Sequence, residues 1–145
     1  MPTINDSIRI NAPVDKVFDY VTTPENWTQY VSSLTDVTNI SSPDLGPGTT
    51  FTWEYKMLGI RLHGTGAVTE NVPNQSFAMR MESAVPFREH YRFTPVDGGT
   101  DLAVTIEYEM PNKVLESIAS AVAEKLNRRE AQNILEKIKT LVEER

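Results

Sequence analysis

The sequence contains no cysteine, which excludes disulfide bridges, thiolate metal ligands and a cysteine nucleophile. No apolar run approaches the roughly 18 residues that a membrane-spanning helix needs. Basic residues are also few, because 14 Lys and Arg stand against 20 Asp and Glu, which gives a net charge of -6. A chain with this acidic excess is expected to bind neither nucleic acid nor an anionic membrane surface, and no stable membrane insertion is expected.

What the chain does have is enough apolar material for one core. Its 145 residues are 39% hydrophobic and 23% charged, a composition typical of a folded protein. No repeat or linker-like segment divides it, so we expect a single domain over residues 1–145. The N-terminus lacks the basic and then apolar pattern of a signal peptide, and a cytoplasmic location is therefore expected.

Periodicity predicts the order of the elements. Residues 3–10 alternate as a strand does, and the apolar residues of 14–21 recur at helical spacing. Thr23 and Pro24 form an N-cap and first-turn pair that predicts a short helix over 25–31. Six further strands are predicted at 34–41, 49–57, 60–70, 75–84, 87–94 and 101–110. The short connections between these strands favour antiparallel hairpins.

The remainder of the chain, after Pro111, is predicted to be one long helix. Its apolar stripe consists of Val114, Leu115, Ile118, Val122, Leu126, Ile134, Ile138, Leu141 and Val142. Thirty-odd residues at about 1.5 Å each give a helix about 50 Å long, which must lie across the sheet. The fold class is therefore α+β, with one long helix covering one face of a seven-stranded antiparallel sheet.

The predicted strands have two different faces. One face combines aromatic residues, methionine and aliphatic residues, and the other carries interspersed charges. Methionine adapts to irregular contents, and Tyr and Trp bring polar atoms that need partners when buried. The first face is therefore either an ordinary core or the lining of a ligand cavity. The residues expected to line such a cavity are Trp53, Tyr55, Leu62, Met79, Met81, Tyr91, Phe93, Val104 and Tyr108 from the strands, and Ile118, Val122 and Arg129 from the helix.

Two glycines interrupt this apolar face. Gly64 and Gly66 have the same parity as Leu62 and Val68. A glycine inside a strand marks a bulge, a sharp bend or a close approach of another group. We expect these glycines to belong to a strongly curved sheet that wraps around the helix.

Glu89 is the polar exception on the apolar face, between Phe87 and Tyr91. A buried carboxylate is costly unless it is paired or protonated, and a raised pKa would suit it to act as a general acid or base. The alternative is that Glu89 lies near the sheet edge and reaches solvent. On the helix, Arg129 or Asn133 could point into the cavity and pair with Glu89, or mark a break that faces solvent.

No cofactor site is predicted. His63 and His90 fall on the charged outer face by parity, and they lack an acidic third ligand at a diagnostic spacing, so no metal site is expected. No phosphate-binding loop, dinucleotide glycine fingerprint, serine elbow or zinc-protease motif is present. We therefore expect neither a metal nor an organic cofactor.

Several motifs, taken together and in order, resemble a known superfamily. They are Ile10, Ala12, Pro13, Val17, Phe18, Tyr20 and Val21; T-x-P-E-N-W at 22–27; G-x-G-T at 46–49; V-T-E-x-x-P-N at 68–74; and Y-R-F-T-P-x-x-G-G-T at 91–100. The chain resembles the START/Bet v 1-like (SRPBCC) superfamily, in particular its polyketide cyclase/dehydrase and lipid-transport-like branch. The resemblance implies a helix-grip fold, in which a curved seven-stranded antiparallel sheet surrounds a long C-terminal helix. It also implies a cavity between sheet and helix for a lipid, sterol, polyketide or aromatic molecule.

Three hypotheses about function follow. The first is a binding or transport module for an apolar or amphipathic small molecule. The second is a polyketide cyclase or dehydratase that uses Glu89 as its acid/base. The third is a protein-binding module of the chaperone-activator type, which would need an exposed apolar patch that the charged outer face does not offer. The sequence specifies neither the ligand nor the oligomeric state.

Overall fold

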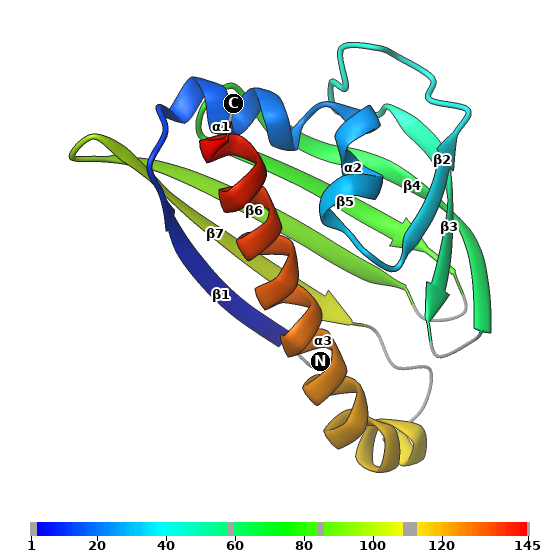
Figure 1. Ribbon diagram of the computed structural model, residues 1–145. Coiled ribbons are helices and arrows are strands. Elements are labelled where there is room, and N and C mark those ends of the chain that lie inside the picture. The colour runs from blue at the N-terminus through cyan, green and yellow to red at the C-terminus, as the bar shows by residue number, and fades with distance from the viewer. Residues whose placement is uncertain (1–2, 58–59, 84–85, 109–112, 145) are drawn as a thin grey trace.

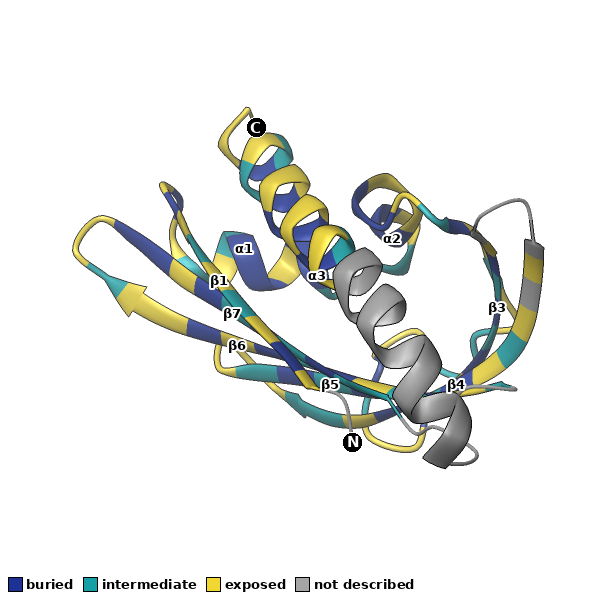
Figure 2. Ribbon diagram, turned by 90° about the horizontal axis from the view of Figure 1, so that it is seen from below, coloured by how far each residue is buried: buried dark blue, intermediate teal, exposed yellow. Residues whose placement is uncertain are grey.

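The computed structural model of the chain describes residues 3–57, 60–83, 86–108 and 113–144. The side chains of residues 57, 60, 62 and 113–127 are not described. The described residues form one curved antiparallel sheet, with three helices on its concave side (Figures 1 and 2). This arrangement confirms the expected helix-grip fold.

The sheet has seven strands in the order β1-β7-β6-β5-β4-β3-β2. From β2 to β7 each strand pairs with the next one in sequence, as the short predicted connections require, and β1 forms the edge beyond β7. The bounds are β1 Thr3–Ile10, β2 Leu34–Thr38, β3 Thr50–Met57, β4 Ile60–Val72, β5 Ser76–Glu82, β6 Phe87–Val96 and β7 Gly99–Tyr108.

Two short helices follow β1, and a long one ends the chain. They are α1 Val14–Val21, α2 Pro24–Tyr30 and α3 Lys113–Glu143. The 31 residues of α3 correspond to about 46 Å, and the helix crosses the concave side of the sheet (Figure 1). Its C-terminal half packs on β1, α1 and α2, and buries Ala131, Ile134, Leu135, Ile138 and Val142. The predicted stripe residues of 114–126 lie outside the described side chains.

Strand β2 is shorter than the predicted 34–41. Its pairing with β3 ends at Thr38, and the next residue, Asn39, has φ 57°, in the left-handed region that interrupts an extended strand. A backbone hydrogen bond from Ser41 N to Thr50 O still holds the two segments together. The difference arises because Asn tolerates a left-handed conformation that apolar alternation does not reveal.

The predicted division of the sheet into two faces is confirmed for the described side chains. The aromatic and methionine-rich face is buried on the concave side, whereas Lys56, Arg61, His63, Arg88 and Arg92, of the opposite parity, are exposed. Ion pairs on the convex face, such as Arg61 with Glu54 at 3.6 Å, are solvated and contribute little stability.

Gly64 and Gly66 allow two aromatic rings to approach the backbone of β4. In the β3–β4 register, Trp53 is opposite Gly64 and Phe51 is opposite Gly66. A Cβ atom on Gly64 would lie 2.5 Å from the Trp53 ring, and one on Gly66 would lie 2.4 Å from the Phe51 ring. The glycines therefore serve as platforms for the cross-strand rings, which is the close approach that the sequence offered as one explanation.

Candidate functional site

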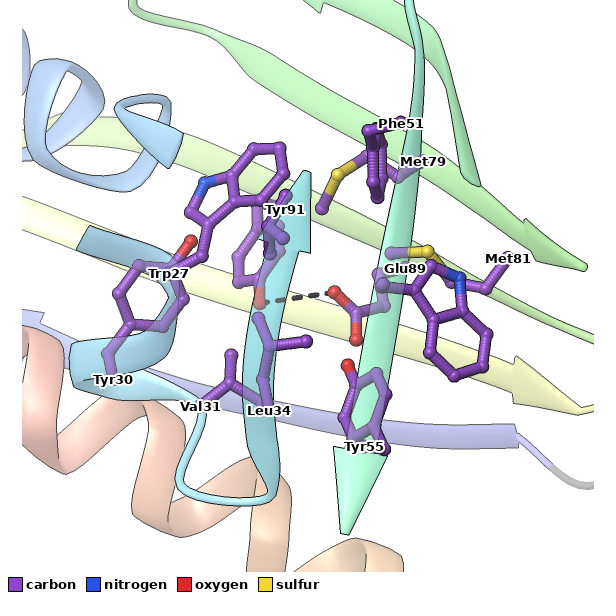
Figure 3. A pocket seen from close by; sticks show the side chains of 12 residues that line it. Trp27, Tyr30, Val31, Leu34, Phe51, Tyr55, Met79, Met81, Glu89 and Tyr91 are labelled. Carbon is purple, nitrogen blue, oxygen red and sulfur yellow. Dashed lines mark hydrogen bonds between the residues drawn. The ribbon is translucent and has the colours of Figure 1, made fainter. Parts of the chain in front are cut away.

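A small, partly open cavity lies on the concave side of the sheet, beneath α2 and β2. Its walls are the inward side chains of β3, β5 and β6, and residues 24–37, called the cover below, close it from above (Figure 3). The volume of the cavity that the centre of a water molecule can occupy is about 20 Å³. A cavity needs roughly 10–15 Å³ of such volume to hold one water. In the described structure, side chains therefore fill most of the space. The lining residues are Trp27, Tyr30, Val31, Leu34, Val37, Phe51, Trp53, Tyr55, Met79, Met81, Glu89 and Tyr91.

Glu89 supplies the carboxyl group of this otherwise apolar and aromatic wall. It lies on β6 between Met79 of β5 and Ile106 of β7, and only 5% of it is exposed. Its side chain points into the cavity, and the Tyr91 hydroxyl donates to Glu89 Oε2 over a long 3.4 Å (Figure 3). Of the two readings of the sequence, the structure therefore agrees with burial and not with a solvated sheet edge.

Burial changes the acidity of this carboxyl group. Loss of hydration raises the pKa of Glu89 from 4.5 to about 7, and the negative charge of Glu130 adds to the rise. The hydrogen bond from Tyr91 acts in the opposite direction, because it stabilises the ionised form. Glu89 can therefore gain or lose a proton near neutral pH.

Four tyrosine hydroxyls lie within electrostatic reach of Glu89. They belong to Tyr30 of α2, Tyr55 of β3, Tyr91 of β6 and Tyr108 of β7, and burial together with the Glu89 charge raises the pKa of each phenol. Figure 3 shows the Tyr55 hydroxyl turned towards the Glu89 carboxyl group. These phenols stay neutral, so Glu89 and Glu130 carry the negative charge of the site.

Glu130 connects α3 to the cover. The Ser33 hydroxyl, between α2 and β2, donates to Glu130 Oε1. Burial raises the pKa of Glu130, while hydrogen bonds from the side chain and backbone of Ser33 oppose that rise. This contact fixes the cover against α3 at the side of the cavity where Glu89 lies.

The other end of the cover is anchored at one backbone carbonyl. Trp27 Nε1 and the Tyr30 hydroxyl both donate to Val21 O, at 2.8 and 2.9 Å. The Trp27 ring also lies 5.2 Å from the Phe51 ring, in an edge-to-face arrangement. The i, i+3 spacing of Trp27 and Tyr30 places both rings on the face of α2 that meets the sheet.

The structure brings only part of the predicted lining together. Trp53, Tyr55, Met79, Met81 and Tyr91 line the cavity with Glu89. The other predicted strand residues are placed elsewhere. Phe93 packs on Phe18 of α1 with ring centroids 5.1 Å apart, Val104 is buried opposite Tyr91, and Tyr108 packs against Phe87 at 5.9 Å. Leu62, Ile118 and Val122 lie outside the described side chains.

Arg129 does not approach Glu89. Arg129 and Asn133 are exposed on α3, which agrees with the alternative in which these two residues face solvent. Glu130 is the residue of α3 that lies near Glu89. The signal for Glu130 was present in the sequence, because it lies four residues before the buried Ile134 and eight before Ile138. The prediction from the sequence named Arg129 or Asn133 for this position, and Glu130 occupies it instead.

The two histidines lie on the convex face, away from the cavity. His63 is near Glu54 at 3.9 Å, and His90 is near Glu70 at 3.0 Å. Among the described residues, no three His, Asp or Glu side chains are grouped closely enough to hold a metal ion. No helix within the described ranges has the length and apolar character that a membrane crossing requires.

Comparison with known proteins gives one family match. The family model described as "Polyketide cyclase / dehydrase and lipid transport" matches residues 1–143. A search of curated proteins gives no match.

Solved structures share the fold at low sequence identity. TTHA0849 from Thermus thermophilus superimposes with a TM-score of 0.82 at 17% identity, over 97% of each chain. The Zhui aromatase/cyclase from Streptomyces sp. R1128 has a TM-score of 0.79 at 15% identity, over 98% of this chain and 93% of that one. Ara h 8.0201 has a TM-score of 0.72 at 14% identity, over 99% of both chains. At these identities the similarities establish the fold and leave the reaction open.

Proposed function

Because the chain belongs to the polyketide cyclase/dehydrase and lipid transport family of the START/Bet v 1-like superfamily, we propose that it binds an apolar or amphipathic small molecule on the concave face of its sheet. The observation that carries this proposal is the buried carboxyl group of Glu89 in an aromatic and methionine-rich wall. Burial of the ligand's apolar surface would contribute about 25 cal/mol per Å², and the carboxyl group would fix its polar end.

Ligand entry requires the cavity to enlarge. The present 20 Å³ admits about one water, so the cover must move or the wall side chains must rearrange. Met79 and Met81 form part of the wall, and their flexible side chains adapt to different contents. The cover is attached to α3 through Ser33 and Glu130, and this contact is the place where opening would begin.

A blocking substitution tests the location of the site. Val37→Trp is expected to weaken binding of the neutral dye Nile red about tenfold, because Val37 lines the cavity from the edge strand β2 and a larger ring would fill it. The measurement is a titration that follows dye fluorescence. Thr38→Trp is the matched control, since Thr38 is the next residue, is exposed and points to the other face.

The two variants give a clear decision. Wild-type affinity in Thr38→Trp and weak binding in Val37→Trp support a ligand on the concave face. Equal affinities in the two variants would place the dye elsewhere, and absence of binding to the wild-type chain would contradict the proposal itself.

A second candidate, acid/base catalysis on a carbonyl compound of the polyketide class, is favoured by the pKa of Glu89, which is raised to about 7. In such a reaction the Glu89 carboxylate would take a proton from the carbon next to a carbonyl group. The electron pair of the C–H bond would form the C=C bond of an enolate, and the π pair of the carbonyl group would move to its oxygen. The carboxyl group would later return the proton.

Deuterium exchange at the activated methylene of benzoylacetone tests this step. If the protein is a general base catalyst, exchange followed by NMR in heavy water should exceed the buffer rate. Glu89→Gln should abolish the excess. Glu136→Gln, an exposed substitution with the same change in charge, should retain it. Exchange at the buffer rate in the wild-type protein would remove the catalytic candidate and leave the binding proposal in place.

A further inference from the structure

The donors and acceptors of the cavity wall are unequally available to a ligand. Trp27 Nε1 and the Tyr30 hydroxyl donate to Val21 O, and Trp53 Nε1 donates to Thr65 O at 2.9 Å. Three of the polar hydrogens in the wall are therefore already used by backbone carbonyls. A ligand group that only accepts hydrogen bonds, such as a carboxylate, finds few donors there.

Acceptors, in contrast, remain open. In the described part of the chain, Glu89 receives one hydrogen bond, the long one from Tyr91 to Oε2, and Oε1 has no partner. Glu130 brings a second carboxyl group from α3 close enough to repel Glu89. None of the residues that line the described cavity is Lys, Arg or His, so these negative charges are not compensated within the wall.

Two tyrosine side chains approach the same carboxyl group within an aromatic wall. Tyr55 and Tyr91 turn their hydroxyls towards it (Figure 3). Tyr30, Trp27 and Trp53 are further aromatic residues of the wall. Both Tyr55 and Tyr91 present their hydroxyl oxygens to the carboxyl group, and a phenol oxygen can accept a hydrogen bond from a cationic N–H donor. A carboxylate beside two phenol oxygens suits a positively charged group that donates hydrogen bonds.

We propose that the ligand of this cavity carries an amine on an apolar skeleton, and that the ammonium group donates to the free oxygen of Glu89 beside the hydroxyls of Tyr55 and Tyr91. This inference rests on the proposed binding function and specifies its ligand class. A fatty acid or a phosphate ester would face two carboxyl groups without a basic partner, and a simple ketone would find few free donors. The amine supplies both the charge and the hydrogens that the site lacks.

The proposal has a defined pH dependence. Among the residues whose side chains are described, the groups that face Glu89 are Glu130 of α3, Tyr30 of α2, Tyr55 of β3, Tyr91 of β6 and Tyr108 of β7, and the four phenols stay neutral. An ammonium ion binds the ionised form of Glu89. Its affinity should therefore rise about tenfold between about pH 6 and about pH 8, as the carboxyl group ionises around its pKa of about 7.

Calorimetric titration with phenethylamine, phenethyl alcohol and phenylacetate tests the ligand class, because the three share one skeleton and differ in the polar group. At about pH 8 the amine should bind at least about tenfold more tightly than the alcohol, and phenylacetate should bind most weakly. In Glu89→Gln the preference for the amine over the alcohol should disappear. In Glu136→Gln, which removes an exposed charge of α3, the preference should persist.

Each other outcome contradicts a particular statement. Equal affinity of the wild-type protein for amine and alcohol would overturn the amine proposal and leave the binding function intact. If the preference for the amine survives in Glu89→Gln, the net charge of -6 accounts for it, and the proposed contact with Glu89 is wrong. Failure of all three compounds and of Nile red to bind would contradict the binding function instead.

Discussion

Gly64→Ala is expected to lower the free energy of unfolding by about 3 kcal/mol, the upper part of the range for overpacking. The added Cβ would lie 2.2 Å from Glu82 O and 2.5 Å from the Trp53 ring. The carbonyl belongs to the backbone of β5 and cannot shift without distorting the β4–β5 ladder. The Trp53 ring is in turn held by its hydrogen bond to Thr65 O. Urea unfolding followed by circular dichroism measures the loss.

Gly46→Ala is the matched control for this substitution. A Cβ on Gly46 would find its nearest neighbour, Asp44 Oδ1, at an ordinary 3.7 Å, and the residue is not among those with positive φ. Its free energy of unfolding should change by less than about 0.5 kcal/mol. If Gly64→Ala behaved like Gly46→Ala, the ring of Trp53 would not be seated on the β4 backbone as described.

Glu89→Gln is expected to stabilise the protein at alkaline pH by about 3 kcal/mol. The folded state raises the pKa of Glu89 from 4.5 to about 7, so it binds this proton more tightly than the unfolded chain does. The resulting stability is fully present below about pH 4.5, declines between about pH 4.5 and about pH 7, and is absent above that range. Each pKa unit corresponds to about 1.4 kcal/mol, which gives the expected magnitude.

The measurement compares urea unfolding of the wild-type protein and Glu89→Gln at about pH 5 and about pH 8. The wild-type protein should lose stability over this interval relative to the variant, and Glu136→Gln should follow the wild type. The decline in stability should be shallower in Glu130→Gln than in the wild-type protein, because this substitution removes the repulsion of Glu89. It should be steeper in Tyr91→Phe, because this substitution removes the hydrogen bond that stabilises the ionised form of Glu89. Parallel curves for the wild-type protein and Glu89→Gln would mean that the carboxyl group is not buried as described.

Alternation within strands was the most informative signal in the sequence. It placed Trp53, Met79 and Tyr91 on the concave face, and it placed Glu89 among them, because side-chain direction in a strand depends on local parity. Parity could not decide whether Glu89 is buried. That depends on the cover, residues 24–37, whose position over β6 is set by tertiary contacts such as Ser33 with Glu130.

Helical periodicity was harder to read at the site. The buried positions of the C-terminal half of α3 follow a spacing of four through Ile134 and Ile138, and Glu130 belongs to the same row. From the sequence, either Arg129 or Asn133 could point towards Glu89, or this part of the helix could face solvent. The structure instead places two acidic side chains together, an arrangement that reduces folding stability and which local sequence patterns do not predict.

The two indole rings of this protein both lie in the cavity wall, Trp27 in the cover and Trp53 on the sheet. The chain contains no other tryptophan. Its near-ultraviolet emission therefore originates chiefly from the walls of the proposed site. Any molecule that enters should alter that emission, so the protein carries its own label-free sensor of occupancy, and ligand libraries can be screened with the unmodified chain.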